Sequence, residues 1–138
     1  MELTTFGAVL RFAIELEAEG ERRYSEAARV AEGQAKEVLT SLARAKRKRR
    51  QLLERARQEN VAEMILESIR DLDGDNYRVA EAGAGHGDVL ERLAAFEAKC
   101  GSFYRDAGGR IGLAEVARIF ERLARENAEQ RERVLVLG

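Results

Sequence analysis

Six charged or amide residues stand where this 138-residue sequence would be expected to carry apolar side chains. Each lies within a stripe of apolar residues spaced alternately three and four apart, and this spacing puts a stripe on the buried face of a helix. A charge buried without a partner is costly. The six residues are Glu17, Lys46, Arg49, Glu97, Asn127 and Gln130.

These six side chains have the chemistry to satisfy one another. The two carboxylates and the two cations balance in charge, and each carboxamide both donates and accepts hydrogen bonds. We therefore predict a buried network of ion pairs and hydrogen bonds, with no catalytic residue and no metal ligand. Such a network adds little net stability, but removing one partner costs about 3–5 kcal/mol because a buried charge is stranded.

The stripes predict four helices that position this network. In chain order they run from about 5 to 32, from 35 to 59, from 88 to 108, and from 112 almost to the end. Gly33 is expected to cap the first helix at its carboxyl end, and Asp88 with Glu91 has the spacing of a capping box. The segment from Val61 to Leu72 is predicted to be a short helix or an irregular apolar stretch. The sequence contains no proline and few aromatic residues, which favours long helices over strands.

The two halves of the sequence repeat each other. Leu10, Glu17 and Tyr24 recur as Leu90, Glu97 and Tyr104 at one constant offset. The residues Leu42-Ala43-Arg44 recur as Leu123-Ala124-Arg125, one residue further on. Each half, about 1–70 and 88–138, is predicted to be a helical hairpin, and we expect the long connection to make the first and third helices parallel. The predicted fold is all-α: a single domain, 1–138, forming a four-helix bundle with an internal duplication and a crossover connection.

Four short motifs resemble those of the ferritin-like superfamily, most closely its rubrerythrin-like branch. The first-helix signature there is Glu-x-Glu-Gly followed by an aromatic-Tyr pair, and residues 17–24 read EAEGERRY while residues 97–104 read EAKCGSFY. The second-helix signature is Leu-Ala-x-Glu-Glu-x-x-His, and the matching stretches are LARAKRKR at 42–49 and LARENAEQ at 123–130. The resemblance spans all four predicted helices and implies a ferritin-like bundle.

The resemblance also implies where a di-iron site would lie. Such bundles take one Glu from each of two helices and a Glu-x-x-His pair from each of the others. Glu17 and Glu97 match the single-Glu positions, but Lys46 with Arg49, and Asn127 with Gln130, replace the pairs. Two cations in the site would repel metal ions, so we predict no cofactor, with iron as the alternative.

Two tyrosines and the single histidine complete the comparison with the family. Tyr24 and Tyr104 match residues that support the metal ligands in relatives, and they are predicted to fill the core and to hydrogen-bond across the bundle. The only histidine, His86, lies in a glycine-rich connection and far along the chain from the heptad positions.

The basic run from Arg44 to Arg50 invites a nucleic-acid interpretation. Helical spacing turns Lys46 and Arg49 inward and leaves a partial basic strip without interleaved aromatic residues. The whole chain has 24 Lys and Arg against 25 Asp and Glu, a formal net charge of -1. We therefore predict a solvated helix face and no nucleic-acid binding.

Two further motifs have a plain structural interpretation beside a functional one. The residues from Gly83 to Gly87 could cradle an anion before a helix, but no strand precedes them, so a flexible linker is favoured. Asp71, Asp73 and Asp75 hint at a calcium loop, but Gly74 comes too early and the closing Glu is missing, which favours a turn.

Cys100 is the chain's single cysteine, so it forms no disulfide within one chain. We favour a small buried apolar residue over a reactive thiol. The reactive interpretation would need Lys46 or Arg49 to lower the pKa of the thiol.

The predicted partners follow from apolar residues on the helix faces, and the predicted location follows from the lack of a targeting signal in the sequence. Phe12, Ile14, Phe96 and Phe103 flank the stripes of the first and third helices, and Val9, Leu16 and Val89 widen these faces. We therefore predict a homodimer, and a protein partner is possible. The sequence shows no signal peptide and no membrane-spanning stretch, so we predict a cytoplasmic protein without membrane contact.

The favoured function is a ferritin-like protein without catalysis, with a structural or interaction role. The alternative is a metal-dependent oxidoreductase or an iron-handling protein that uses Glu17 and Glu97, with Glu63 or Glu126 as additional ligands.

Overall fold

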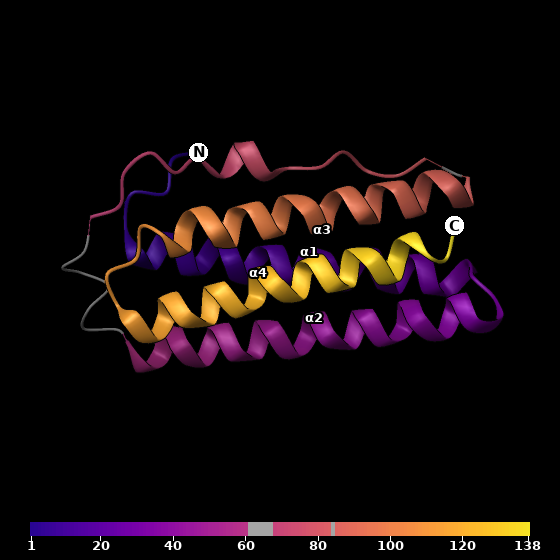
Figure 1. The fold of residues 1–138 in the computed structure, drawn as a ribbon, viewed down its shortest axis with the longest axis horizontal. Coiled ribbons are helices and arrows are strands. Elements are labelled where there is room, and N and C mark those ends of the chain that lie inside the picture. The colour runs from indigo at the N-terminus through magenta and orange to yellow at the C-terminus, as the bar shows by residue number, and fades with distance from the viewer. Residues whose placement is uncertain (61–67, 84) are drawn as a thin grey trace.

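Four long helices form the protein, and the computed structural model describes residues 1–60, 68–83 and 85–138. Figure 1 shows the helices side by side along one long axis. The predicted all-α four-helix bundle is therefore confirmed. Its helices are α1 (Phe6–Val30), α2 (Gly33–Glu59), α3 (His86–Gly108) and α4 (Ala114–Leu135), with a short 3-10 helix η2 (Gly74–Tyr77) between α2 and α3.

The helix ends follow local capping chemistry, with two corrections. The Thr5 hydroxyl accepts a hydrogen bond from the backbone N–H of Ala8 at 3.0 Å and caps α1. The predicted cap of the first helix at Gly33 is wrong, because α1 ends at Val30 and its C-cap is Ala31; Gly33 is the first residue of α2, with a φ of 62° that glycine adopts without strain. The predicted capping box of the third helix is wrong: α3 begins earlier, and Asp88 in its first turn instead accepts from the backbone N–H of Gly83.

The helix directions differ from the prediction, because α1 and α3 are antiparallel. Tyr24, near the end of α1, bonds to Glu97 in the first half of α3, whereas Tyr104, near the end of α3, bonds to Glu17. Figure 1 shows the reason: the connection after α2 runs along the length of the bundle. It reaches the end where α1 finishes, so α3 starts there and runs back.

The connection is held against the bundle by the amino-terminal segment. The backbone N–H of Leu3 donates to the carbonyl of Leu72 at 2.8 Å, and that of Ile69 donates to the carbonyl of Thr4 at 2.9 Å. Residues 68–72 are thus not the predicted short helix, and 61–67 lie outside the described residues. At the predicted turn, the Asp73 and Asp75 carboxylates bind the Met1 amine at 2.8 and 2.6 Å.

The connection also covers the apolar residues on which the dimer prediction relied. A Cβ at Gly74 would lie 2.6 Å from the Phe12 ring, so this turn rests directly on that side chain. The ring of Tyr77 packs edge-on against Phe103 at 5.4 Å. Phe12, Phe96 and Phe103 are buried within one chain, so they offer almost no surface to a second copy, whereas Ile14 and Val89 stay partly exposed. The homodimer stays a prediction, with a weaker argument for it.

The apolar core falls into two clusters on either side of the six polar residues. One cluster surrounds Phe6, Phe103 and Phe120, and the other surrounds Leu42 and Leu90. Within the described residues, no helix combines the length and the apolar character that crossing a membrane requires.

Candidate functional site

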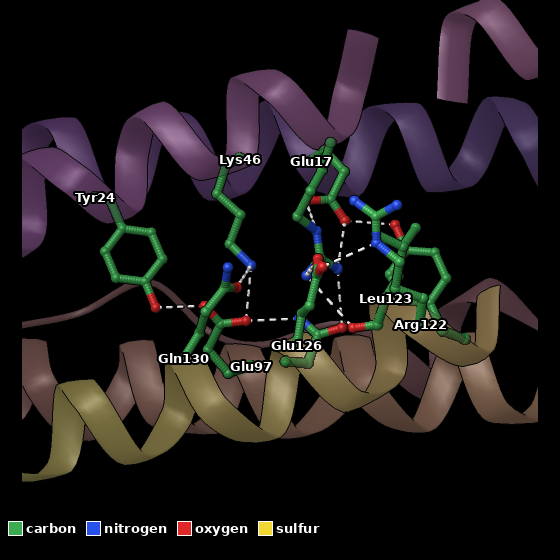
Figure 2. Close-up of polar contacts among 11 residues, drawn as sticks. Glu17, Tyr24, Lys46, Glu97, Arg122, Leu123, Glu126 and Gln130 are labelled. Atoms are coloured by element: carbon green, nitrogen blue, oxygen red, sulfur yellow. Dashed lines mark hydrogen bonds and ion pairs between the residues drawn. The ribbon is translucent and has the colours of Figure 1, made fainter. Parts of the chain in front are cut away.

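The six predicted polar residues meet in the middle of the bundle, between the two apolar clusters. Lys46 and Glu97 have no exposed side-chain surface, and Arg49 is only 4% exposed. Each of the four helices contributes: Glu17 comes from α1, Lys46 and Arg49 from α2, Glu97 from α3, and Asn127 and Gln130 from α4. Figure 2 shows Lys46, Glu97 and Gln130 pointing toward one another from three different helices.

One half of the network is built around Glu97. Its Oε1 accepts from Lys46 Nζ and from Asn127 Nδ2, each at 2.7 Å. Its Oε2 accepts from the Tyr24 hydroxyl at 2.6 Å. Lys46 Nζ also donates to Gln130 Oε1 at 2.9 Å, so the ammonium bridges α3 and α4 (Figure 2). The carboxylate is therefore held by three donors from three different helices.

The other half is built around Glu17 and Arg49. Arg49 Nη2 donates to Glu17 Oε2 at 3.1 Å and to Asn127 Oδ1 at 2.9 Å. Arg49 Nε and Glu17 Oε1 lie 3.0 Å apart as an ion pair, although without the alignment of a hydrogen bond. The Tyr104 hydroxyl donates to Glu17 Oε2. Asn127 joins the two halves, because its oxygen accepts from Arg49 and its nitrogen donates to Glu97.

The two tyrosines exchange partners between the duplicated halves. Tyr24 of the first hairpin donates to Glu97 of the second, and Tyr104 of the second donates to Glu17 of the first. Burial raises the pKa of both hydroxyls well above 10, and the carboxylate that each one faces acts in the same direction. Both tyrosines are therefore neutral donors at ordinary pH.

Glu17 and Arg49 each keep the other side chain ionised. Burial by itself would raise the pKa of Glu17, but the positive charges of Arg49 and Lys46 outweigh it and hold that pKa below 4.5. Burial would likewise lower the pKa of Arg49, and the Glu17 carboxylate outweighs it and raises the pKa instead. The ion pair is thus fully charged in the folded protein.

The lowered pKa of Glu17 predicts a loss of stability in acid. The folded state favours the ionised carboxylate, so this contribution is complete above the ordinary pKa of 4.5 and disappears as the pH falls through the lower folded pKa. In urea unfolding followed by circular dichroism, we expect the free energy of unfolding to fall more steeply below pH 4.5 in the wild type than in Glu17→Gln. Equal slopes would contradict this assignment.

Glycine makes room for the buried lysine. A Cβ at Gly20 would lie 3.1 Å from Lys46 Cδ and 3.1 Å from Phe96 Cε2, closer than an ordinary contact. At Gly101, in the other hairpin, the nearest atoms would be 3.5 Å away, which is an ordinary contact. The role of Gly20 is not visible in the sequence, because its contact with Lys46 depends on how α1 packs against α2.

These two glycines make a matched pair of substitutions. Gly101→Ala should stabilise the protein by roughly 0.5–1 kcal/mol, because alanine is the better helix former and the methyl group fits. Gly20→Ala should instead destabilise by about 1 kcal/mol or more, because overpacking against Lys46 and Phe96 exceeds the same gain. Thermal unfolding of both variants tests the difference. A similar stabilisation by both would mean that the Lys46 stem is not confined.

The residues at the centre do not fit a dinuclear metal site. The Lys46 ammonium and the Arg49 guanidinium lie within 3.1 Å of Glu97 and Glu17, the two carboxylates at the single-Glu ligand positions. Both groups only donate hydrogen bonds, so they compete with metal ions for the same oxygens. Across residues 1–60, 68–83 and 85–138, no group of three or more His, Cys, Asp or Glu side chains is arranged to hold a metal.

The alternative ligands do not complete such a site in the described structure. Glu126 lies at the edge of the network, where its Oε1 is 3.6 Å from Arg49 Nη1 and its Oε2 binds Arg122 at 3.0 Å. Glu63 falls among residues 61–67, which the structure does not describe. His86 is exposed at the first residue of α3.

Two other predicted features have a clear environment. Cys100 is fully buried, and burial raises the pKa of its thiol well above 9, against the opposing effect of Lys46, so the reactive interpretation loses its chemical basis. In the basic run, Arg47 and Arg50 form ion pairs with Glu21 at 2.7 and 3.1 Å. These pairs reduce the free positive charge of the strip, and the absence of nucleic-acid binding stays a prediction.

Comparison with known proteins supports the fold and leaves the family open. The sequence matches no protein-family model and no curated protein. The chain is similar in structure to a dodecameric thioferritin, the bacterioferritin-related protein of Bacteroides fragilis, with a TM-score of 0.71 and 17% sequence identity. The match covers 92% of this chain and 80% of that one. The fold is therefore ferritin-like.

This likeness overturns the prediction that the protein takes no cofactor. That prediction was drawn from the replaced ligands alone, whereas the chain has the fold of a thioferritin. Ferritin-like bundles commonly carry metal sites in their cores. The misfit of the central residues thus applies to the space between Glu17 and Glu97, and it does not extend to the protein as a whole.

Proposed function

We propose that this protein is a ferritin-like protein with a structural or interaction role, in which the centre of the bundle acts as a structural clamp. The observation that carries the proposal is the closed set of contacts that joins all four helices through Lys46, Arg49 and Asn127. Each carboxylate that a metal would need is already held by a cation and a tyrosine. We propose no catalytic residue at this centre.

Several finer features belong to the same proposal. Residues 1–138 form a single domain, because the two hairpins share one polar network. We propose the rubrerythrin-like branch, supported by the motif likeness at residues 17–24 and 97–104, with the Glu-x-x-His pairs replaced. The cytoplasm is the proposed location. We also propose self-association, supported by the dodecameric state of the thioferritin, with a homodimer as the smallest form; light scattering over a range of concentrations measures it.

The clamp can be tested by unfolding the protein with and without a chelator. If the network holds the centre together, treatment with an iron chelator leaves the thermal unfolding temperature unchanged, even in protein purified from iron-supplemented cells. A lower unfolding temperature after chelation, with no such effect in Glu17→Gln, would show that a metal at the centre stabilises the bundle instead.

Iron handling is the second candidate, favoured by the fold shared with a thioferritin. In this case iron is cargo, held at a site other than the ion-paired centre. Metal analysis of the purified protein, together with its absorption spectrum, distinguishes the two. A transition metal retained at a fixed ratio to the chain would favour iron handling, and its retention in Glu17→Gln would place it outside the centre.

A further inference from the structure

The internal duplication allows the outer grooves of the two hairpins to be compared. Between α1 and α2, the Glu21 carboxylate lies between two arginines: Arg47 Nε is 2.7 Å from its Oε2, and Arg50 Nη1 is 3.1 Å from its Oε1. The Glu21 side chain is only 16% exposed. In the first hairpin, therefore, a carboxylate from the chain fills the groove and neutralises the arginines beside it.

The second hairpin lacks this carboxylate. The offset that relates Glu17 to Glu97 puts Gly101 in the place of Glu21. The offset that relates Ala43 to Ala124 puts Ala128 in the place of Arg47, and Arg131 in the place of Arg50. The second groove thus keeps one of the two arginines and has lost the acidic side chain that pairs with it.

A cavity lies at this position between α3 and α4. Its volume is about 260 Å³, its floor includes Gly101, Ala124 and Ala128, and Arg105 and Arg131 line it. It shares Arg105, Ala124 and Ala128 with a neighbouring cavity of about 510 Å³. Together they form a groove, which we call the α3–α4 groove, of the size that small molecules occupy.

The charges along the α3–α4 groove are mainly positive. Arg105, Arg125 and Arg131 line it, against the exposed carboxylate of Glu121. The Glu97 carboxylate is buried beneath the groove and is already paired with Lys46. In the described part of the chain, Arg105 and Arg125 form no ion pair, and Arg131 has a long one, 3.7 Å to the exposed Glu132.

We propose that the α3–α4 groove binds a carboxylate supplied from outside the chain, in the place that Glu21 fills in the first hairpin. Arginine is suited to this role because its guanidinium donates two parallel hydrogen bonds to one carboxylate. The carboxylate has two possible sources, a small organic dicarboxylate or an acidic side chain of a second copy. Both sources supply a carboxylate to the same arginines, and the two arms of the experiment below distinguish them.

The first arm of the test is calorimetric titration of the full-length protein with succinate, with succinamide as the uncharged control. Saturable binding of succinate alone is expected. Arg131→Gln should weaken it about tenfold or more, since it removes a charged hydrogen-bond donor. Gly101→Glu should abolish it by placing a carboxylate in the groove, where the contacts around Gly101 leave room for a Cβ. Arg50→Gln, the matched change in the first hairpin, should leave binding unchanged.

The second arm is sedimentation of the same variants, checked for folding by circular dichroism. If the carboxylate comes from a second copy, Arg131→Gln and Gly101→Glu reduce self-association while Arg50→Gln does not. Either pattern supports the proposal and identifies the source. The proposal is overturned if neither succinate binding nor self-association responds to Arg131→Gln and Gly101→Glu, or if Arg50→Gln has the same effect.

Discussion

Glu97→Gln is expected to cost about 3–5 kcal/mol of the free energy of unfolding, because it leaves the Lys46 ammonium buried without a counter-charge. Lys46 has no exposed side-chain surface, and its ammonium also donates to the neutral Gln130 oxygen at 2.9 Å. Lys46→Met should also destabilise, since it strands the Glu97 carboxylate with only the Tyr24 and Asn127 donors. Urea unfolding of each single variant measures these costs.

The double variant Lys46→Met with Glu97→Gln should be more stable than either single variant. It removes both charges and keeps an amide oxygen that can accept from Tyr24 or Asn127. The methionine side chain, which is similar in length, fills the space that the aliphatic part of Lys46 occupied. The coupling energy should therefore reach about 2 kcal/mol or more, as expected for buried partners in contact. The exposed Arg22–Glu26 pair, 3.3 Å apart, is the matched control and should couple by less than about 0.5 kcal/mol. Coupling of similar size in both pairs would contradict a buried clamp.

The sequence alone was sufficient to predict the bundle, and it also predicted which polar residues would lie at its centre. Heptad spacing depends only on helix geometry, so it places Glu17, Lys46, Arg49 and Glu97 on buried faces without knowledge of the neighbouring helices. The structure brings all four together, with Lys46 and Glu97 fully buried. Local capping was predictable at the start of α1, where the Thr5 hydroxyl caps the helix, but not at its end, where Ala31 rather than Gly33 is the cap.

The pairing within the centre was not predictable in this way. Lys46 and Arg49 lie on the same face of α2, and which carboxylate each one reaches depends on how α1 and α3 are placed around it. The antiparallel course of α1 and α3 settles this: Lys46 binds Glu97, whereas Arg49 binds Glu17. That course depends on the long connection, whose path is fixed by contacts distant in sequence, such as those of Tyr77 with Phe103 and Asp106.

The same long-range contacts explain why the apolar width of α1 and α3 was misjudged. Phe12 and Phe103 have the helical spacing of a second buried side, and the sequence pattern carries no information on what covers that side. In the structure the connection does so, with Gly74 against Phe12 and the Arg23 guanidinium bound to the Val79 carbonyl at 2.7 Å. An apolar face on a helix thus indicates burial, and it does not identify the partner.

Restoring the two Glu-x-x-His pairs is expected to make folding depend on metal. The variant carries Lys46→Glu, Arg49→His, Asn127→Glu and Gln130→His, which together with Glu17 and Glu97 complete the ligand set of ferritin-like metal sites. Without metal, four carboxylates would share the buried centre with no cation among them, so the apo variant should be strongly destabilised or unfolded.

Cobalt(II) should rescue the restored variant, because only the folded state assembles the site. Binding to the folded state alone stabilises by about 4 kcal/mol when the metal is in thousandfold excess over its dissociation constant. Thermal unfolding with and without cobalt(II) measures the rescue, and the visible absorption of bound cobalt reports its coordination. The wild type is the control, since its Lys46 and Arg49 already neutralise Glu97 and Glu17. A variant that folds equally well with and without cobalt, and binds no more of it than the wild type, would show that the helices do not place these positions around a metal-sized space. The two basic side chains would then be part of a different centre, rather than cations standing where metal ions would bind.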